Sequence, residues 1–155
     1  MLKISEVKTP EHVEIARALF REYADSLGFD LSFQNFEQEL AELPGHYAPP
    51  DGRLYLAFEG KRPAGCIALR KLSDDDCEMK RFYVCPLFRG KGLGKRMATL
   101  LINEAREIGY KRMLLDTVPS MKRAMVLYRA LGFKSVPPYR ENPVPGASFL
   151  ELPLR

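Results

Sequence analysis

The sequence predicts one α/β (α+β) domain over residues 1–155, with a mixed central sheet of about seven strands and four helices packed around it. Two observations support this prediction. Strand-like and helix-like stretches follow one another in the order β-α-α-β-β-β-α-β-α-β-β. A length of 155 residues also suits a single domain of ordinary size, and no domain-boundary linker divides it.

The first third of the chain predicts a strand and two helices. Residues 3–8 alternate apolar and polar side chains, as a strand does. Thr9 followed by Pro10 is a helix start and Gly28 a helix end, with apolar residues between them at three- and four-residue steps. Ser32 is the expected N-cap of the second helix. The elements to which the sequence assigns bounds are, in order, a strand over 3–8, helices over 10–27 and 33–43, strands over 53–58, 63–70 and 77–84, a helix over 93–108, a strand over 111–117, a helix over 121–131 and a strand over 148–154, and the seventh strand is expected without bounds of its own.

The middle of the chain predicts three strands. The stretches 53–58 and 63–70 flank a tight turn, which is a hairpin pattern, and the central strand 77–84 follows an acidic turn at Asp74–Asp76. We expect these aspartates to be solvated, because three consecutive side chains cannot readily converge on one metal ion.

A parallel crossover is expected in the second half of the chain. Residues 93–108 carry one continuous apolar face, and 111–117 is short and uniformly apolar, as in a strand covered on both faces. Together with strand 77–84 they form a right-handed βαβ unit. Ser120 is the expected cap of the next helix, and Gly132 its end.

The composition predicts a cytoplasmic protein without a membrane segment. No apolar run approaches the roughly 20 residues that span a bilayer, and Met1–Glu6 lacks the apolar core of a signal peptide. Cys66, Cys77 and Cys85 have no Cys-x-x-Cys spacing, so we expect reduced thiols that pack on strands. Neither of the two histidines has a second ligand at metal-binding spacing, so no metal is expected.

The net charge of +4 favours attraction to an anionic ligand. The basic residues are spread along the chain without an aromatic-interleaved stripe or a helix-turn-helix pattern. Nucleic acid is therefore disfavoured as a partner.

A basic turn punctuated by glycines is the most informative feature of the chain. It joins strand 77–84 to helix 93–108, and Gly90, Gly92 and Gly94 permit conformations and close approaches that a Cβ would block. The helix directs its first unpaired N–H groups and its positive dipole end into the turn. The turn therefore predicts a site for a pyrophosphate. Its positive charges come from Arg89, Lys91, Lys95 and Arg96.

Two common phosphate loops are excluded by their spacing. A Walker loop needs a glycine five residues before the glycine of its Gly-Lys pair and Ser or Thr after it, but Arg89 and Arg96 occupy those positions. The dinucleotide fingerprint fails because Lys95 and Met97 stand where its third glycine should be. A nucleotide-binding regulator is therefore disfavoured.

The remaining pattern, Arg89-x-x-Gly92-x-Gly94, resembles the [Gln/Arg]-x-x-Gly-x-[Gly/Ala] signature of the GNAT superfamily of acyl-CoA-dependent N-acyltransferases. The sequence FYVCP at 82–86 is similar to the family's strand end and Val-x-Pro segment, and AMVLYRALGF at 124–133 to its Ala-x-x-Leu-Tyr-x-x-Leu-Gly-Phe segment. The resemblance implies the GNAT fold, in which two central strands splay apart to form the CoA cleft. Within this superfamily, the sequence resembles a histone-acetyltransferase-like member of bacterial type.

The resemblance implies acetyl-CoA as the co-substrate and assigns its contacts. Main-chain groups at the end of strand 77–84 would bind the pantetheine arm and polarise the thioester carbonyl. Met121 stands where the family often has a cofactor-contacting Asn, and Ser120 is the expected substitute. The implied cofactor-binding residues are Phe82, Tyr83, Val84, Arg89, Gly90, Lys91, Gly92, Leu93, Gly94, Lys95 and Ser120.

Two residues are candidates for the chemistry. Glu78 lies eleven residues before Arg89, a spacing that resembles the catalytic Glu of histone-type members. A base there would accept a proton from an amine whose pKa is about 10.4. Tyr128 stands where the family has a proton donor to the leaving thiolate. The alternatives are that Glu78 is an outward-facing strand residue paired with Lys80 or Arg62, and that Tyr128 only packs in the core.

The predicted function is acetyl transfer from acetyl-CoA to a primary amine of a small molecule or peptide, directly in a ternary complex. The acceptor is expected between loops 28–32 and 137–148, where the Arg140 guanidinium suits a carboxylate. A covalent route through Cys85 is disfavoured. The alternative from another class is a non-catalytic acyl-CoA-binding regulatory module. No membrane partner is expected, and a homodimer is left open.

Overall fold

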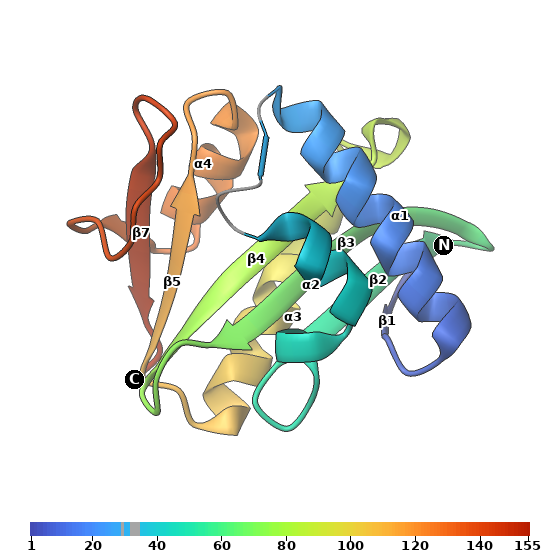
Figure 1. Cartoon of the computed structure of the whole chain (residues 1–155), viewed down its shortest axis with the longest axis horizontal. Helices are drawn as coiled ribbons and strands as arrows, with labels where there is room; N and C mark the ends of the chain where they lie inside the picture. The colour runs from blue at the N-terminus through green and yellow to red at the C-terminus, as the bar shows by residue number, and fades with distance from the viewer. Residues whose placement is uncertain (29, 32–34) are drawn as a thin grey trace.

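The computed structural model describes residues 1–28, 30–31 and 35–155, and shows one seven-stranded sheet with helices on both faces (Figure 1). The strand order is β1-β2-β3-β4-β5-β7-β6. The strands are β1 (Leu2–Glu6), β2 (Arg53–Glu59), β3 (Arg62–Lys71), β4 (Asp76–Val84), β5 (Arg112–Thr117), β6 (Lys134–Ser135) and β7 (Ser148–Pro153). The helices of the described chain are α1 (Pro10–Leu27), α2 (Phe36–Glu42), α3 (Leu93–Ile108) and α4 (Lys122–Ala130), with short 3₁₀ turns at Gly45–Tyr47 and Pro86–Phe88.

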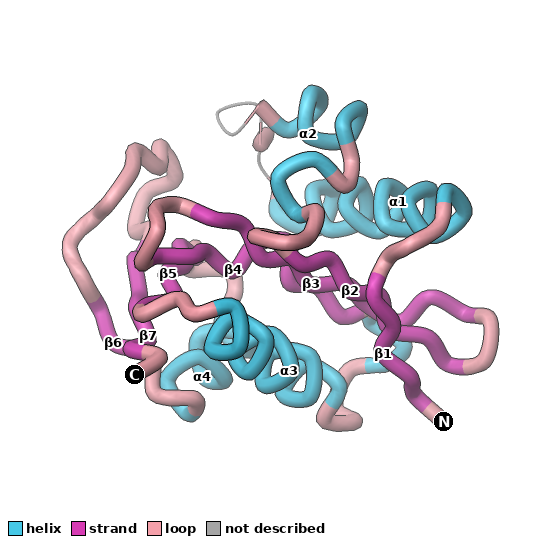
Figure 2. Tube along the Cα trace, turned by 90° about the horizontal axis from the view of Figure 1, so that it is seen from below, coloured by secondary structure: helices cyan, strands magenta, loops and turns pink. Residues whose placement is uncertain are grey.

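The sheet is mixed and lies between two helical layers. β4 and β5 pair in parallel through the α3 crossover, and the other neighbouring strands pair antiparallel. Helices α1 and α2 cover one face of the sheet, and α3 and α4 cover the other (Figure 2). The predicted fold class is therefore confirmed.

The first helix forms as its sequence predicts. The Thr9 side chain accepts a hydrogen bond from the His12 N–H at 3.1 Å, and Gly28 ends the helix in the left-handed conformation. The strand before it runs over Leu2–Glu6, not 3–8, because its pairing with β2 begins at Leu2 and ends at Glu6.

The second helix is shorter than predicted. It begins at Phe36, after Asn35 in the left-handed region with a φ of 55°. The expected cap, Ser32, and the first two residues of the predicted helix lie outside the described residues.

The prediction that Ser120 caps the fourth helix is wrong. Met121 is the N-cap, it makes no side-chain capping bond, and the helix begins at Lys122. The reason is a preceding turn, in which the Met121 N–H donates to the Val118 carbonyl at 2.9 Å and delays the helix by one residue. The predicted helix end holds, since the Gly132 N–H donates to the Arg129 carbonyl at 3.1 Å.

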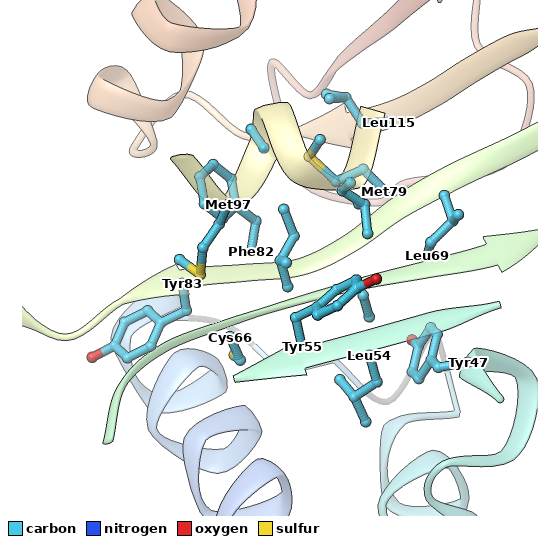
Figure 3. Close-up of a cluster of buried hydrophobic side chains, with 14 of the residues drawn as sticks. Tyr47, Leu54, Tyr55, Cys66, Leu69, Met79, Phe82, Tyr83, Met97 and Leu115 are labelled. Carbon is cyan, nitrogen blue, oxygen red and sulfur yellow. The ribbon is translucent and has the colours of Figure 1, made fainter. Parts of the chain in front are cut away.

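The core fills both faces of the central strands. Cys66 lies on the α1 side of the sheet, whereas Met79, Met97 and Leu115 pack on the α3 side (Figure 3). The cysteines are free and buried, so they pack as predicted. No helix among the described residues is long and apolar enough to cross a bilayer.

Candidate functional site

The site begins where β4 and β5 separate. The two strands pair only from Asp76–Glu78 to Arg112–Leu114, and beyond these residues they diverge (Figure 1). β4 also bulges there: Arg81 has a φ of 55°, and the β3–β4 register shifts between Cys66 and Ala68. In the described chain, no strand pairs with the second half of β4 along the edge that faces β5. That edge can therefore accept an extended ligand.

The glycine turn leads from the end of β4 into α3. Gly90 and Gly92 have φ values of 79° and 80°, where a side chain would strain the backbone. Gly92 is the N-cap of α3, and no described side chain caps the helix. The first helical bond runs from the Arg96 N–H to the Gly92 carbonyl, so the N–H groups of residues 93–95 face the turn. This arrangement suits an anion.

The third glycine serves close packing instead. A Cβ on Gly94 would lie 3.3 Å from Cζ of Phe82 and 3.6 Å from Cδ2 of Leu127. Since Gly94 stands between β4 and α4, any side chain there would press into the space between these elements. Its role therefore differs from that of the two turn glycines.

A groove of about 500 Å³ runs along the turn and the first turn of α4, and we call it the turn groove. Of the predicted cofactor-binding residues, Lys91 and Lys95 are not among the described residues that line it. Lys122 and Arg123 line it as well, although neither residue was predicted from the sequence. The groove is lined by Ser26, Leu27, Phe82, Tyr83, Val84, Phe88, Arg89, Gly90, Gly92, Leu93, Gly94, Ser120, Met121, Lys122, Arg123, Ala124 and Leu127.

Arg89 holds the turn against the end of β4. Its Nε donates to the Val84 carbonyl at 2.9 Å, and its guanidinium lies 5.7 Å from the centre of the Tyr83 ring. The side chain thus shapes the groove in addition to carrying charge.

A second and smaller cavity, of about 40 Å³, lies where β4 and β5 diverge, and we call it the inner cavity. It meets the turn groove at Leu27, Phe82 and Met121, which line both. Elements far apart in the sequence build it: α1, β4, β5, α4 and the loop before β7. It is lined by Tyr23, Leu27, Leu31, Met79, Lys80, Arg81, Phe82, Asp116, Thr117, Val118, Met121, Tyr128 and Asn142.

Tyr128 reaches the inner cavity from α4. Its ring centre lies 6.1 Å from that of Phe82 and 5.7 Å from that of Phe133, and only 5% of the residue is exposed. Burial raises the pKa of its hydroxyl well above the ordinary value, so the group remains protonated. Tyr128 therefore brings a protonated hydroxyl to the lining of the inner cavity.

Glu78 lies in a buried ionic cluster. Arg70 donates to its carboxylate at 2.8 Å and Tyr139 at 2.6 Å, and Arg140 forms a further ion pair with it. The residue is fully buried, so the alternative of an outward-facing side chain is wrong. Its ion pairs are to Arg70 and Arg140, and not to Lys80 or Arg62.

These partners weaken Glu78 as a base. Burial acts to raise the pKa of its carboxyl, but Lys80, Arg140, the Tyr139 hydrogen bond and Arg70 outweigh burial and hold the pKa below its ordinary value. A carboxylate that already accepts three hydrogen bonds has little affinity for another proton. Glu78 is also not among the described residues that line the inner cavity.

Lys80 also lines the inner cavity, although it was not among the site residues predicted from the sequence. Only 7% of the residue is exposed, and burial followed by the Arg81 charge lowers its pKa to about 7. Its position two residues after Glu78 on one strand could have indicated a shared face of the sheet. The sequence feature that could have indicated Lys80 as a site residue is the presence of a lysine within a strand expected at the centre of the sheet.

Among the described residues of the two loops expected to bind the acceptor, Leu31 and Asn142 line the inner cavity. Phe29 and Ser32 lie outside the described residues. Arg140 binds Glu78 instead of facing the cavity. Asn142 Nδ2 donates to the Asp116 carboxylate at 3.1 Å, so this loop is tied to β5.

A covalent route finds little support at Cys85. Burial raises the pKa of its thiol to about 11, and its Sγ lies 3.7 Å from the Pro63 carbonyl. Among the described residues, no group of three or more His, Cys, Asp or Glu side chains could hold a metal ion.

The chain is similar in sequence to known N-acetyltransferases. Residues 13–133 match the model of the Acetyltransferase (GNAT) family. An uncharacterized N-acetyltransferase of Schizosaccharomyces pombe is 37% identical over 97% of this chain and 94% of its own length. An uncharacterized N-acetyltransferase of Escherichia coli is 32% identical over 88% of this chain and 82% of its own.

Solved structures share the fold. An acetyltransferase from Streptococcus agalactiae superposes with a TM-score of 0.81 at 20% identity, covering 98% of each chain. A GNAT family acetyltransferase from Elizabethkingia anophelis, solved with acetyl-CoA bound, superposes with a TM-score of 0.65 at 20% identity, covering 98% of this chain and 97% of its own.

Proposed function

Because this chain belongs to the acetyltransferase (GNAT) family of N-acetyltransferases, we propose that it transfers an acetyl group from acetyl-CoA to a primary amine of a small molecule or peptide. The transfer is direct, within a ternary complex. One observation carries this proposal: the turn groove and the inner cavity meet where β4 and β5 separate. A donor lying in the groove and an acceptor amine in the cavity would come into contact at that junction.

The turn groove has the features that a CoA thioester requires. The N–H groups at the start of α3 face the glycine turn and are suited to the pyrophosphate. The unpaired edge of β4 at Phe82–Val84 offers main-chain groups to the pantetheine arm and the thioester carbonyl. Bound acetyl-CoA would supply an activated acetyl group. The contacts of all the predicted cofactor-binding residues, including Lys91, Lys95 and Ser120, stay predictions.

Tyr128 is the proposed proton donor. When the amine attacks the thioester carbonyl, the C–N bond forms, the C–S bond breaks and the sulfur leaves with the electron pair. The nitrogen loses one proton and the sulfur gains one, so the products are the amide and the free thiol of CoA. A thiolate with a pKa of about 8.5 gains from a nearby donor. Burial raises the pKa of Tyr128, so its hydroxyl is protonated at neutral pH and can donate a hydrogen bond to the developing thiolate.

The remaining assignments concern the subtype within the family, the role of Glu78, the cellular compartment and the oligomeric state. A histone-acetyltransferase-like subtype with Glu78 as the base stays a prediction, and the ion pairs of Glu78 favour a role in anchoring Arg140 and Tyr139. We also propose the cytoplasm as the compartment, which agrees with the free buried cysteines. Homodimer formation stays open.

The proposal is tested by thermal shift and by thiol release. We expect acetyl-CoA to raise Tm, and free CoA to be released when a responsive amine is added from a panel of amino acids, polyamines and peptides. No thermal shift with acetyl-CoA would overturn the proposal. A clear shift without turnover on any amine would favour the non-catalytic acyl-CoA-binding module.

Replacing Gly94 with valine tests the groove separately. We expect the Kd for acetyl-CoA to rise at least about tenfold, because the added methyl groups meet Phe82 and Leu127 where even a Cβ is crowded. Isothermal titration calorimetry measures this change. Thr99→Val, on the exposed face of the same helix, is the control and should leave Kd unchanged. Equal affinities in the two variants would mean that acetyl-CoA binds elsewhere.

A further inference from the structure

The end of β4 directs main-chain groups toward the side on which β5 separates from it. The Cys85 N–H donates to the Ala64 carbonyl at 2.8 Å, so the main-chain groups of Cys85 are directed toward β3. Hydrogen-bonded and non-hydrogen-bonded residues alternate along a strand of an antiparallel pair. The N–H and C=O groups of Phe82 and Val84 therefore point away from β3, and we call this side of β4 the open edge.

The side chain of Arg89 covers part of the open edge. Its Nε donates to the Val84 carbonyl at 2.9 Å, and its guanidinium lies 5.7 Å from the centre of the Tyr83 ring. That ring lies on the α1 side of the sheet (Figure 3), where its hydroxyl donates to the Glu22 carboxylate at 2.7 Å. The guanidinium is thus held at the end of β4 by a carbonyl and by a ring that α1 fixes in place.

A pantetheine arm would need the same carbonyl. The arm contains secondary amides, and an extended chain added to a strand edge exchanges N–H···O=C bonds with that edge. On the open edge, the acceptors for its N–H groups are the carbonyls of Phe82 and Val84. A carbonyl can accept a second hydrogen bond, but the Arg89 side chain occupies the space beside it. The arm and Arg89 therefore compete for the end of the strand.

The remaining donors of Arg89 are available to an anion. A guanidinium carries several N–H donors, and the Val84 carbonyl is the one group in the described part of the chain that accepts a hydrogen bond from this residue. The side chain is exposed, lines the turn groove and immediately precedes Gly90 of the glycine turn. A diphosphate at the turn would offer it charge-assisted, bidentate bonds, which are stronger than one bond to a neutral carbonyl.

We propose that Arg89 makes the donor site selective for thioesters that carry a diphosphate. A phosphate-free pantetheine thioester has to displace the guanidinium from the open edge without compensation. The diphosphate of CoA instead draws the guanidinium to the glycine turn and leaves the Val84 carbonyl to the arm. This inference rests on the proposed function and specifies its donor class, which is CoA thioesters and not simple pantetheine thioesters.

The first experiment compares the wild type with Arg89→Met in the absence of an acceptor amine. Calorimetry measures the Kd for acetyl-CoA, and ligand-detected NMR measures the Kd for S-acetylpantetheine. We expect the Kd for acetyl-CoA to rise about tenfold, because the diphosphate loses a charged partner. The Kd for S-acetylpantetheine should fall by about threefold or more, because no guanidinium has to leave the open edge. The two affinities should therefore change in opposite directions.

Arg106→Met is the matched control for this experiment. The Arg106 Nε also donates to a main-chain carbonyl, that of Leu154 at 3.3 Å, but it does so at the opposite end of α3 from the glycine turn. The variant removes the same charge and the same kind of contact. Both Kd values should stay within about twofold of the wild type, because solvent and salt screen a charge so far from the turn groove.

The second experiment uses the wild-type protein and inorganic pyrophosphate as the probe. Pyrophosphate at the glycine turn should draw Arg89 away from Val84, so we expect it to lower the Kd for S-acetylpantetheine by about threefold or more. By linkage, S-acetylpantetheine should tighten the binding of pyrophosphate by the same factor. This coupling should disappear in Arg89→Met, and sodium chloride at matched ionic strength should not produce it in either protein.

The outcomes separate this inference from the proposed function. If Arg89→Met bound S-acetylpantetheine no better than the wild type does, or if pyrophosphate had no effect on that affinity, the inference would be overturned. The guanidinium would then keep the Val84 carbonyl while it binds the diphosphate. An unchanged Kd for acetyl-CoA in Arg89→Met would overturn it as well. The proposed function would survive each of these results, whereas failure of acetyl-CoA to bind the wild type would contradict the proposed function itself.

Discussion

Replacing Tyr128 with phenylalanine is expected to lower kcat about 100-fold, because it removes the proposed proton donor, and general acid catalysis typically contributes at least this much. The substitution removes one oxygen and keeps the ring against Phe82 and Phe133. We therefore expect the Kd for acetyl-CoA and Tm to stay close to those of the wild type. Thiol release under saturating substrates measures kcat, and calorimetry measures Kd.

Tyr110→Phe is the matched control. Tyr110 is equally buried, but its hydroxyl donates to the Asp51 carbonyl at 2.8 Å, away from both cavities. We expect this variant to lose some stability and to keep kcat. If Tyr128→Phe kept kcat as well, Tyr128 would be a packing residue, which is the alternative that its apolar helix face suggested.

Replacing Glu78 with alanine is expected to destabilise the protein by about 3–5 kcal/mol, because it leaves buried arginine charge without its partner. For a chain of this size, Tm should fall by roughly 6–20 °C. Chemical and thermal unfolding at pH 7 measure the loss. Glu14→Ala is the control: its pair with Arg17 is exposed, and such pairs contribute about 1 kcal/mol or less.

The stabilisation by Glu78 should depend on pH. Since its folded pKa is below the ordinary value, the stabilisation is fully present above the unfolded pKa of about 4.3 and is lost as pH falls through the folded pKa. The stability difference between the wild type and Glu78→Gln should therefore shrink only below about pH 4. A difference that vanished nearer pH 6 would mean that the pKa is raised, as a catalytic base requires.

The same Glu78→Gln variant separates anchoring from catalysis. If Glu78 is the base, kcat falls steeply, the acidic limb of the kcat–pH profile disappears, and KM stays unchanged. If it anchors Arg140 and Tyr139, the change appears in KM and in stability, because the loop beside the inner cavity loosens. The geometry of the cluster favours the second result.

Local sequence patterns predicted helices and strands correctly where the ends of an element depend on a few neighbouring residues. The first helix was marked at both ends by Thr9 and Gly28, which act within one turn of chain. Ser120 shows the limit of such evidence: a suitable capping residue was present, but the Met121 turn moved the helix start. The carbonyl that sets this turn, that of Val118, lies at the end of β5, where packing decides the path.

The sequence by itself determined the half of the site that is proposed to bind the donor. The glycine turn, the strand before it and the start of α3 are contiguous, and their chemistry depends on backbone conformation within a few residues. Only the tertiary structure decided the other half. It buried Glu78 among Arg70, Tyr139 and Arg140, and it placed Lys80 in a cavity with Asp116 and Thr117. The physical reason is that charge and desolvation depend on neighbours brought together across the fold, and these neighbours have no fixed spacing along the chain.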